Sequence, residues 1–288
     1  MSAVTLPITS GSSASPAPRR ATSALVTGAG RRLGRAIAWA LAQEGWPVAV
    51  HYRSARDEAE SLVAAITEAG GQAAAFYCDL AQPLPAADID LWFNKISEQL
   101  GPVEVLVNSA SLFSFDLADS CNAEGLLHHY QTNLIGPVLL TQALYRHVQK
   151  RPYGPSSPVY PCGVAINLLD QKLANPNPDF FSYTLSKAAL QQATALMARS
   201  LAPWLRVVGL SPGFTLIAEG QSPQAFAQAH RISPLGESSR PEEIAQAVCW
   251  IATARAITGS TILVDGGQHL IPSSRDLQFV TGPTPSST

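Results

Sequence analysis

The stretch "SALVTGAGRRLGRAIAWALAQEG", residues 23–45, decides the fold. It passes from a short apolar run into the loop "TGAGRRLG", residues 27–34, and then into a helical pattern that stops at Gly45. Gly28 permits a tight turn and Gly34 permits close packing, while the N-terminus of the helix offers free N–H groups to an anion. An ordinary glycine turn is the alternative, but a loop between a strand and a helix favours a phosphate-binding site.

Six further short runs rich in Ala, Val, Ile and Leu follow along the chain. They lie near residues 47–52, 73–80, 103–110, 163–170, 205–212 and 260–267. Most lack the alternation of a half-exposed strand, which is typical of parallel strands covered by helices on both faces. Helical patterns separate them, two long ones covering about residues 121–150 and 182–201. The sequence therefore predicts an α/β fold, a Rossmann-type doubly wound sheet of seven parallel strands with helices on both faces.

One domain is expected over residues 21–270, because no internal repeat or linker interrupts the pattern. Residues 1–20 are rich in Ser, Ala and Pro and are expected to form a disordered extension, and residues 271–288 a loose tail. The first twenty residues lack the apolar core of a secretory signal. An organelle transit peptide is an alternative that the prolines of this stretch disfavour.

Composition excludes several classes of function. Hydrophobic residues make up 46% of the 288 residues, charged residues 14%, and the formal net charge is -2, so no nucleic-acid partner is expected. No apolar run reaches the roughly 18 residues of a membrane-spanning helix. Four cysteines are scattered without a CxxC pair, which predicts reduced thiols, a cytoplasmic location and no metal site.

The second strand ends in "HYRS", which selects the cofactor. An acidic residue at this place would bind the ribose 2'-hydroxyl of NAD, whereas Arg53 and Ser54 suit a 2'-phosphate, so we expect NADPH. The predicted contacts from this strand end are His51, Tyr52, Arg53 and Ser54. Asp79, which precedes Leu80 at the end of the third strand, is placed to accept from the adenine amino group, with a plain strand-end turn as the alternative.

The phosphate loop carries two arginines, Arg31 and Arg32, followed by Leu33. Two guanidinium groups at the mouth of an anion site can hold phosphate and face the substrate, although surface decoration is the alternative.

"YTLSK" places Tyr183 and Lys187 four residues apart on one face of a helix. An ammonium beside a phenol favours the phenolate, so we expect Lys187 to lower the pKa of Tyr183 and to hold ribose hydroxyls. This spacing is common by itself, and it indicates a catalytic pair only because a phosphate loop precedes it in the chain.

Together these residues resemble the short-chain dehydrogenases/reductases over about residues 21–270. The matching motifs are "TGAGRRLG", "NSAS" (residues 108–111), Asn133, "YTLSK", "SPG" (residues 211–213) and "VDGG" (residues 264–267). The resemblance implies a Tyr-Lys-Asn proton relay in which Asn133 bends its helix and holds a water that leads protons to Lys187. It also implies a homotetramer formed through the two long helices, and cofactor contacts from Asn108, Ser109, Ala110, Ser111, Pro212 and Gly213.

Asp170 departs from the family pattern. It stands thirteen residues before Tyr183, where the family usually has a serine that donates a hydrogen bond to a carbonyl oxygen, and an ionised aspartate cannot donate. The sequence resembles the pteridine and dihydromonapterin reductases, which also have an aspartate at this place and the loop sequence "RRLGR". They are similar in two further features, Ser111 with Phe113 and a second strand that runs into "HYRS". In those enzymes this strand end is often one residue longer. A strand-ending Asp in a solvated turn is the local alternative.

The chemistry of a pterin agrees with this resemblance, because its reduction adds hydride to carbon and a proton to ring nitrogen. Asp170, shielded from water, would have a raised pKa and pass on that proton, or accept from a protonated ring. Phe113 would stack on the ring, with a plain apolar wall as the alternative.

The predicted function is therefore NADPH-dependent reduction of a pterin or dihydropterin. The catalytic residues would be Asp170, Tyr183, Lys187 and Asn133. The substrate-binding residues would be Arg32, Ser111, Phe113, Asp170, Tyr183, Phe214 and Leu216. The segment after "SPG", from about residue 214 to about residue 231, is expected to form a mobile lid. Rivals are a reductase of another carbonyl or imine and a non-catalytic NADP(H)-binding sensor.

Overall fold

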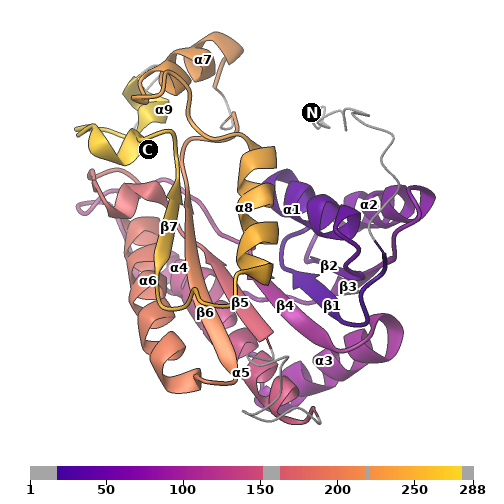
Figure 1. Ribbon diagram of the computed structural model, residues 1–288. Helices are drawn as coiled ribbons and strands as arrows, with labels where there is room; N and C mark the ends of the chain where they lie inside the picture. Colours follow the sequence, from indigo (N-terminus) through magenta and orange to yellow (C-terminus); the bar gives the residue numbers. More distant parts are fainter. Residues whose placement is uncertain (1–17, 152–162, 218–220, 281–288) are drawn as a thin grey trace.

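The computed structural model describes residues 18–151, 163–217 and 221–280, and its centre is one sheet of seven parallel strands (Figure 1). The strand order is β3-β2-β1-β4-β5-β6-β7, and each strand lies within one of the predicted apolar runs. Their bounds are β1 (Ser23–Val26), β2 (Val48–Tyr52), β3 (Ala73–Tyr77), β4 (Val103–Asn108), β5 (Gly163–Leu168), β6 (Leu205–Pro212) and β7 (Thr261–Val264). The predicted doubly wound parallel sheet is thereby confirmed.

Helices cover both faces of this sheet (Figure 1). On one face pack α1 (Arg32–Gln43), α2 (Arg56–Glu68) and α8 (Pro241–Thr253), and on the other α3 (Ala86–Leu100), α5 (Gly136–Gln149) and α6 (Phe181–Leu201). Successive strand residues serve opposite layers: Val26 belongs to the first core and Leu25 to the second, and both are fully buried. This explains why the strands read as continuous apolar runs.

The chain reverses its direction of travel across the sheet between β1 and β4. β1 pairs with β2 on one side and with β4 on the other, so the crevice between the loops after β1 and β4 lies at the switch point. In open α/β sheets this crevice, beyond the carboxyl ends of the strands, is where ligands bind. The fold thus places the phosphate loop and the predicted catalytic residues together, beyond the carboxyl ends of the strands.

The long helix predicted over about residues 121–150 is interrupted at Asn133. It consists of α4 (Ala123–Tyr130), a π-helical turn η1 (Gln131–Ile135) and α5. Pro137, four residues after Asn133, has no N–H, so the bond that an α-helix would direct at the Asn133 carbonyl does not form. The helix is irregular at Asn133, where the resemblance implies a bend, and the relay role of this residue stays a prediction.

The last described residues correct a prediction. After β7 come η3 (Gln268–Leu270) and a short α9 (Leu277–Val280), which lies beside α7 (Pro223–Arg231) beyond the ends of β6 and β7 (Figure 1). Residues 271–280, expected to be part of a loose tail, instead pack on the molecule, because Leu277 and Phe279 are buried and the Phe279 ring contacts Phe115 and Phe180. Residues 281–288 and residues 1–17 of the predicted extension lie outside the described residues.

The sequence predicts a mobile lid from about Phe214 to about Arg231. The structure forms α7 within it, and residues 218–220 lie outside the described part of the chain. No helix among the described residues is long and apolar enough to cross a membrane.

Candidate active site

The phosphate loop depends on its glycines. Gly28 has a φ of 65°, a left-handed conformation that favours glycine, and a Cβ on Gly34 would lie 2.4 Å from the Gly28 carbonyl oxygen. The hydroxyl of Thr27 accepts from the N–H groups of Ser109 and Ala110, both at 2.9 Å, and so joins this loop to the one after β4. The N-terminus of α1 therefore faces a crevice that two tied loops enclose.

His51 is part of this support. Its side chain is 2% exposed, its Nδ1 accepts from the Gly28 N–H at 2.9 Å, and its Nε2 lies 2.9 Å from the Cys78 carbonyl oxygen, to which it donates. Burial lowers the pKa of His51 to about 4. The imidazole is thus neutral at pH 7 and is occupied with shaping the loop.

A groove of about 730 Å³ runs over the ends of β1, β2, β4 and β5. Sixteen of the predicted cofactor contacts line it: Gly28, Arg31, Arg32, Leu33, Gly34, His51, Tyr52, Arg53, Ser54, Leu80, Ser109, Ala110, Ser111, Tyr183, Lys187 and Pro212. Asp79 does not, since its carboxylate accepts from Ala81 N–H in its own turn, and Asn108 is buried with its amide donating to Asn167. Gly213 lines the neighbouring cavity instead.

The cationic side chains of the groove differ in their partners. Arg31 forms an ion pair with Glu58 on α2. Arg32 has a φ of 51° and donates to the Ile217 carbonyl oxygen at 3.2 Å, and burial lowers the pKa of its guanidinium. Arg53 has no carboxylate partner within the described residues, so its charge is available at the end of β2.

Asp170 and Tyr183 form one hydrogen-bonded pair. The Tyr183 hydroxyl donates to Oδ2 of Asp170 at 2.8 Å, while Oδ1 accepts from the Lys172 N–H at 2.8 Å. Tyr183 stands in the first turn of α6 and Asp170 just beyond β5, so the strand and the helix present the two groups to each other. Asp170 is half-buried and Tyr183 is buried.

Lys187 lies behind this pair. Its ammonium donates to the Leu168 carbonyl oxygen at 2.7 Å and is 5.7 Å from the centre of the Tyr183 ring. Burial lowers the pKa of Lys187 to about 8, although the charge of Asp170 opposes this shift.

Burial and the short Asp–Tyr contact determine the proton affinities. Burial raises the pKa of Asp170, as the sequence predicted, while the Lys172 N–H and the Tyr183 hydroxyl oppose the shift. Burial and then the charge of Asp170 raise the pKa of Tyr183 well above its ordinary value. The predicted lowering of the Tyr183 pKa by Lys187 is therefore wrong for this arrangement, because the carboxylate contacts the hydroxyl and the ammonium does not.

Asn133 connects the loop after β4 to α6. Its Oδ1 accepts from Leu112 N–H at 2.7 Å, and its Nδ2 donates to the Leu112 carbonyl at 2.9 Å and to Ser186 Oγ at 3.0 Å. Among the described residues, the Asn133 side chain forms no direct hydrogen bond to Lys187, and the relay water stays a prediction.

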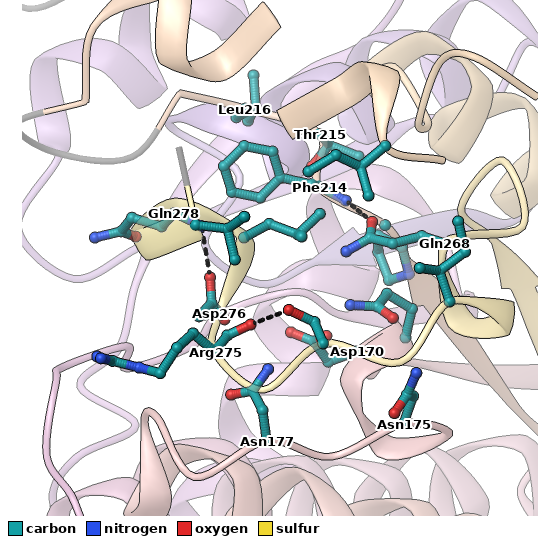
Figure 2. A pocket seen from close by; sticks show the side chains of 18 of the residues that line it. Asp170, Asn175, Asn177, Phe214, Thr215, Leu216, Gln268, Arg275, Asp276 and Gln278 are labelled. Atoms are coloured by element: carbon teal, nitrogen blue, oxygen red, sulfur yellow. Dashed lines mark hydrogen bonds between the residues drawn. The ribbon is translucent and has the colours of Figure 1, made fainter. Parts of the chain in front are cut away.

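A second cavity, of about 370 Å³, shares Phe113, Tyr183 and Leu216 with the groove and has Asp170 in its wall (Figure 2). Of the predicted substrate contacts, six line it, namely Arg32, Phe113, Asp170, Tyr183, Phe214 and Leu216, while Ser111 lines the groove. Phe113 is 49% exposed and stacks on Phe180 with ring centres 4.1 Å apart.

The sequence interpretation missed much of this cavity. Five amide side chains line it, from Gln171, Asn175, Asn177, Gln268 and Gln278, and the last of these belongs to the C-terminal segment 271–280, which contributes further lining residues (Figure 2). The amide-rich "QKLANPNP", residues 171–178, directly after Asp170 was an available signal. No local pattern could reveal the C-terminal segment, which comes from about a hundred residues further along. No cluster of metal-ligating side chains exists among the described residues, where Cys78, Cys121 and Cys249 are free thiols and Cys162 is not described.

Comparison with known proteins finds similarity to reductases and other oxidoreductases. A family model described as enoyl-(acyl carrier protein) reductase matches residues 28–269. An uncharacterised oxidoreductase of Methylorubrum extorquens is 32% identical over 253 residues, which cover 85% of this chain and 96% of that protein.

Two solved structures are also similar. FolM alternative dihydrofolate reductase 1 from Brucella suis in complex with NADP has a TM-score of 0.78 and 35% identity, covering 88% of this chain and 96% of that one. The angucycline C-6 ketoreductase LanV with bound NADP has a TM-score of 0.76 and 30% identity, covering 88% and 98%. With the motifs, the fold and these matches in agreement, the chain belongs to the short-chain dehydrogenase/reductase family.

Proposed function

We propose that this protein is an NADPH-dependent reductase of a pterin or dihydropterin. The observation that carries the proposal is the carboxyl of Asp170, held 2.8 Å from the Tyr183 hydroxyl at the wall of the second cavity. A carboxyl with a raised pKa can supply a proton to a ring nitrogen, as C=N reduction requires. The similarity to the Brucella suis protein, titled an alternative dihydrofolate reductase, supports the same substrate class.

The groove fits a dinucleotide with a 2'-phosphate. The glycine loop and the α1 N-terminus would hold the pyrophosphate, Arg53 and Ser54 the 2'-phosphate, and Lys187 the ribose hydroxyls. When bound, the cofactor supplies the hydride. A carboxylate in place of Arg53 would repel the 2'-phosphate, so this end of β2 favours NADPH over NADH.

The side chains of the pair would handle the proton. Asp170 in its protonated form can donate to a ring nitrogen, and Tyr183, hydrogen-bonded to it, can return a proton to the carboxylate. Lys187, next to Tyr183 and with a pKa of about 8, exchanges protons near neutral pH, which suits it to replenish the pair.

The second cavity suits a flat heterocycle. Phe113 presents an exposed aromatic ring to it, and amide side chains surround the side away from the groove. Amides donate and accept hydrogen bonds, which matches the alternating donors and acceptors on the edge of a pterin.

A substrate panel tests the proposal. NADPH oxidation would be measured with dihydrobiopterin, dihydromonapterin, dihydrofolate and simple ketones, each also with NADH. We expect turnover of at least one dihydropterin and preference for NADPH. Turnover of ketones alone would refute the pterin proposal and favour the second candidate, a ketoreductase, which the similarity to LanV supports. NADPH binding without turnover of any compound would favour a sensor.

We further propose that the protein forms a homotetramer through its two long helical segments. Leu127 on α4, Ile135 at the π turn and Leu196 on α6 are exposed apolar residues of these segments. Light scattering coupled to gel filtration measures the mass directly, and a monomeric mass would exclude this assembly.

A further inference from the structure

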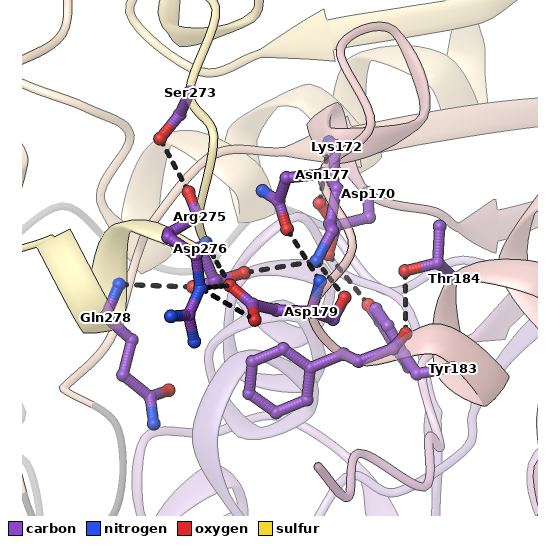
Figure 3. A network of polar contacts seen from close by, with 11 residues as sticks. Asp170, Lys172, Asn177, Asp179, Tyr183, Thr184, Ser273, Arg275, Asp276 and Gln278 are labelled. Atoms are coloured by element: carbon purple, nitrogen blue, oxygen red, sulfur yellow. Dashed lines mark hydrogen bonds and ion pairs between the residues drawn. The ribbon is translucent and has the colours of Figure 1, made fainter. Parts of the chain in front are cut away.

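The C-terminal segment, residues 271–280, is tied to the loop that follows Asp170 (Figure 3). Nε of Arg275 donates to both carboxylate oxygens of Asp179, at 3.0 and 2.8 Å, and Asp276 N–H donates to Oδ2 of Asp179 at 2.7 Å. Asp179 is 0% exposed. A buried carboxylate with three such bonds holds its partners firmly, because leaving it unpaired would be costly.

Lys172 forms a second connection, and it lies nearer to Asp170. Its side chain is 4% exposed, its ammonium donates to the Asp179 carbonyl oxygen, and the ammonium lies 3.5 Å from Oδ2 of Asp276. The backbone N–H of the same residue donates to Oδ1 of Asp170. One residue therefore contacts the C-terminal segment through its side chain and the Asp170 carboxylate through its backbone.

The turn that carries Asp170 has little support of its own. It is the three-residue 3₁₀ turn η2 (Gln171–Leu173), for which Asp170 is the N-terminal cap. A turn this short forms few internal hydrogen bonds, so its orientation depends on what holds its side chains. Lys172 is the buried member of the turn.

We propose that Lys172 and Asp276 are positioning residues for Asp170. The ion pair between buried Lys172 and half-buried Asp276 holds the turn, and the turn directs the Asp170 carboxylate toward the Tyr183 hydroxyl. This inference rests on the proposed role of Asp170 in proton transfer. It makes the C-terminal segment part of the active site rather than a mere cover of the cavity.

A double-mutant cycle tests the pair. Lys172→Met removes the cation and keeps an apolar stem, and Asp276→Asn removes the anion at constant shape. We expect each to lower kcat about tenfold or more with little change in the Kd for NADPH, and the double variant to be no worse than the poorer single variant. Lys172→Arg, which keeps the charge, should retain more activity than Lys172→Met. Arg240→Met breaks the exposed ion pair with Glu237 and serves as the matched control, with kcat unchanged.

The pH profile separates positioning from a merely structural role. The titratable and charged groups around the site are Lys172 and Asp276, Tyr183 and Lys187 of α6, and Asp179 with Arg275. The charge of Asp276 raises the pKa of Asp170 and that of Lys172 lowers it. Asp276→Asn should therefore move the limb of the kcat profile that reports Asp170 to lower pH, and Lys172→Met to higher pH. Unchanged kcat and unmoved limbs in both variants would overturn the proposal.

Failure of the proposed function would look different. If the wild-type protein reduces only ketones, the cycle is run with the ketone, and the same pattern supports or overturns the positioning role. If the wild-type protein turns over none of the substrates, amide hydrogen exchange of residues 170–174 in the NADPH complex tests the positioning role instead. We expect faster exchange in Asp276→Asn than in wild type and in Arg240→Met, and equal exchange would overturn the inference.

Discussion

At the scale of single residues, the pairing of Asp170 with Tyr183 separates this site from one built around a serine. A serine hydroxyl at this place would donate to a carbonyl oxygen, whereas Asp170 accepts from Tyr183 and is pushed by burial toward its protonated form. The local sequence allowed two interpretations of Asp170, a strand-ending turn and a reacting group. The structure shows that the same carboxylate caps η2 with one oxygen and accepts from Tyr183 with the other, so a role as a turn cap leaves the second oxygen for the proposed chemistry.

Asp170→Asn should lower dihydropterin turnover by about 10²-fold or more, because an amide cannot cycle between proton donor and acceptor. The Kd for NADPH should change little, since the groove is built mainly from other residues. Steady-state kinetics and fluorescence titration measure the two quantities. Asp170→Ser is the informative companion, because it should favour ketones over dihydropterins, and an unchanged rate in both variants would remove Asp170 from the mechanism.

Arg53 carries the second prediction at this scale. Arg53→Gln should lower kcat/KM for NADPH by about tenfold to a hundredfold, since a charge-assisted hydrogen bond contributes about 1.5–3 kcal/mol. The kcat/KM for NADH should stay nearly unchanged, because NADH has no 2'-phosphate. Arg56→Gln is the matched control, because Arg56 lies three residues further on and pairs with exposed Glu60. Equal losses with both cofactors would assign Arg53 to folding instead of 2'-phosphate recognition.

At the scale of elements, the loop between β1 and α1 is the most tightly determined part of the site. Gly34→Ala should destabilise the protein by about 2 kcal/mol or more and weaken NADPH binding, because the new Cβ would lie 2.4 Å from backbone oxygen. Gly125→Ala in α4, whose Cβ would meet only Asn122 Oδ1 at 3.5 Å, should be neutral or stabilising by up to about 1 kcal/mol. Thermal unfolding of the two variants measures the contrast, and equal behaviour would contradict it.

The sequence predicted the elements well where the cause is local. All seven strands were found because burial on both faces leaves continuous apolar runs. The irregular turn at Asn133 was expected only from the family resemblance, and Pro137, which lacks a donor, accounts for it. Contacts across long sequence separation were not predictable. Asp179 and Arg275 are 96 residues apart, and no local sequence pattern near either residue predicts that they pair.

His51 shows a different limit. Its place at the end of β2 suggested contact with cofactor, and it does line the groove, but both ring nitrogens are engaged by the protein. A sequence pattern gives the position of a side chain along a strand and not the bonds that its atoms make. The direction of the Tyr183 pKa was missed for the same reason, because it depends on which charged atom contacts the hydroxyl.

At the scale of the whole molecule, buried His51 predicts a loss of stability in mild acid. Its pKa is about 4 in the folded state and about 6.5 in the unfolded chain, so the unfolded state takes up the proton first as the pH falls. Its contribution is complete above about pH 6.5 and is lost progressively toward pH 4, by about 3 kcal/mol in total. Denaturant unfolding at pH 7 and pH 4.5 measures this, and His51→Gln should flatten the difference. An equal pH dependence in the variant would show that other groups cause the loss.

The near-parallel rings of Phe113, Phe180 and Phe279 have a consequence for the binding of a flat ligand. Phe180 stacks on Phe113 at 4.1 Å and on Phe279 at 5.7 Å, so one series of rings reaches from the second cavity into α9. A flat ligand resting on Phe113 would lengthen that series by one ring. Linkage is reciprocal, so if docked α9 strengthens the binding of such a ligand, the ligand must stabilise the docked α9 by the same free energy. Binding and release of the ligand would then be thermodynamically coupled to docking and release of α9.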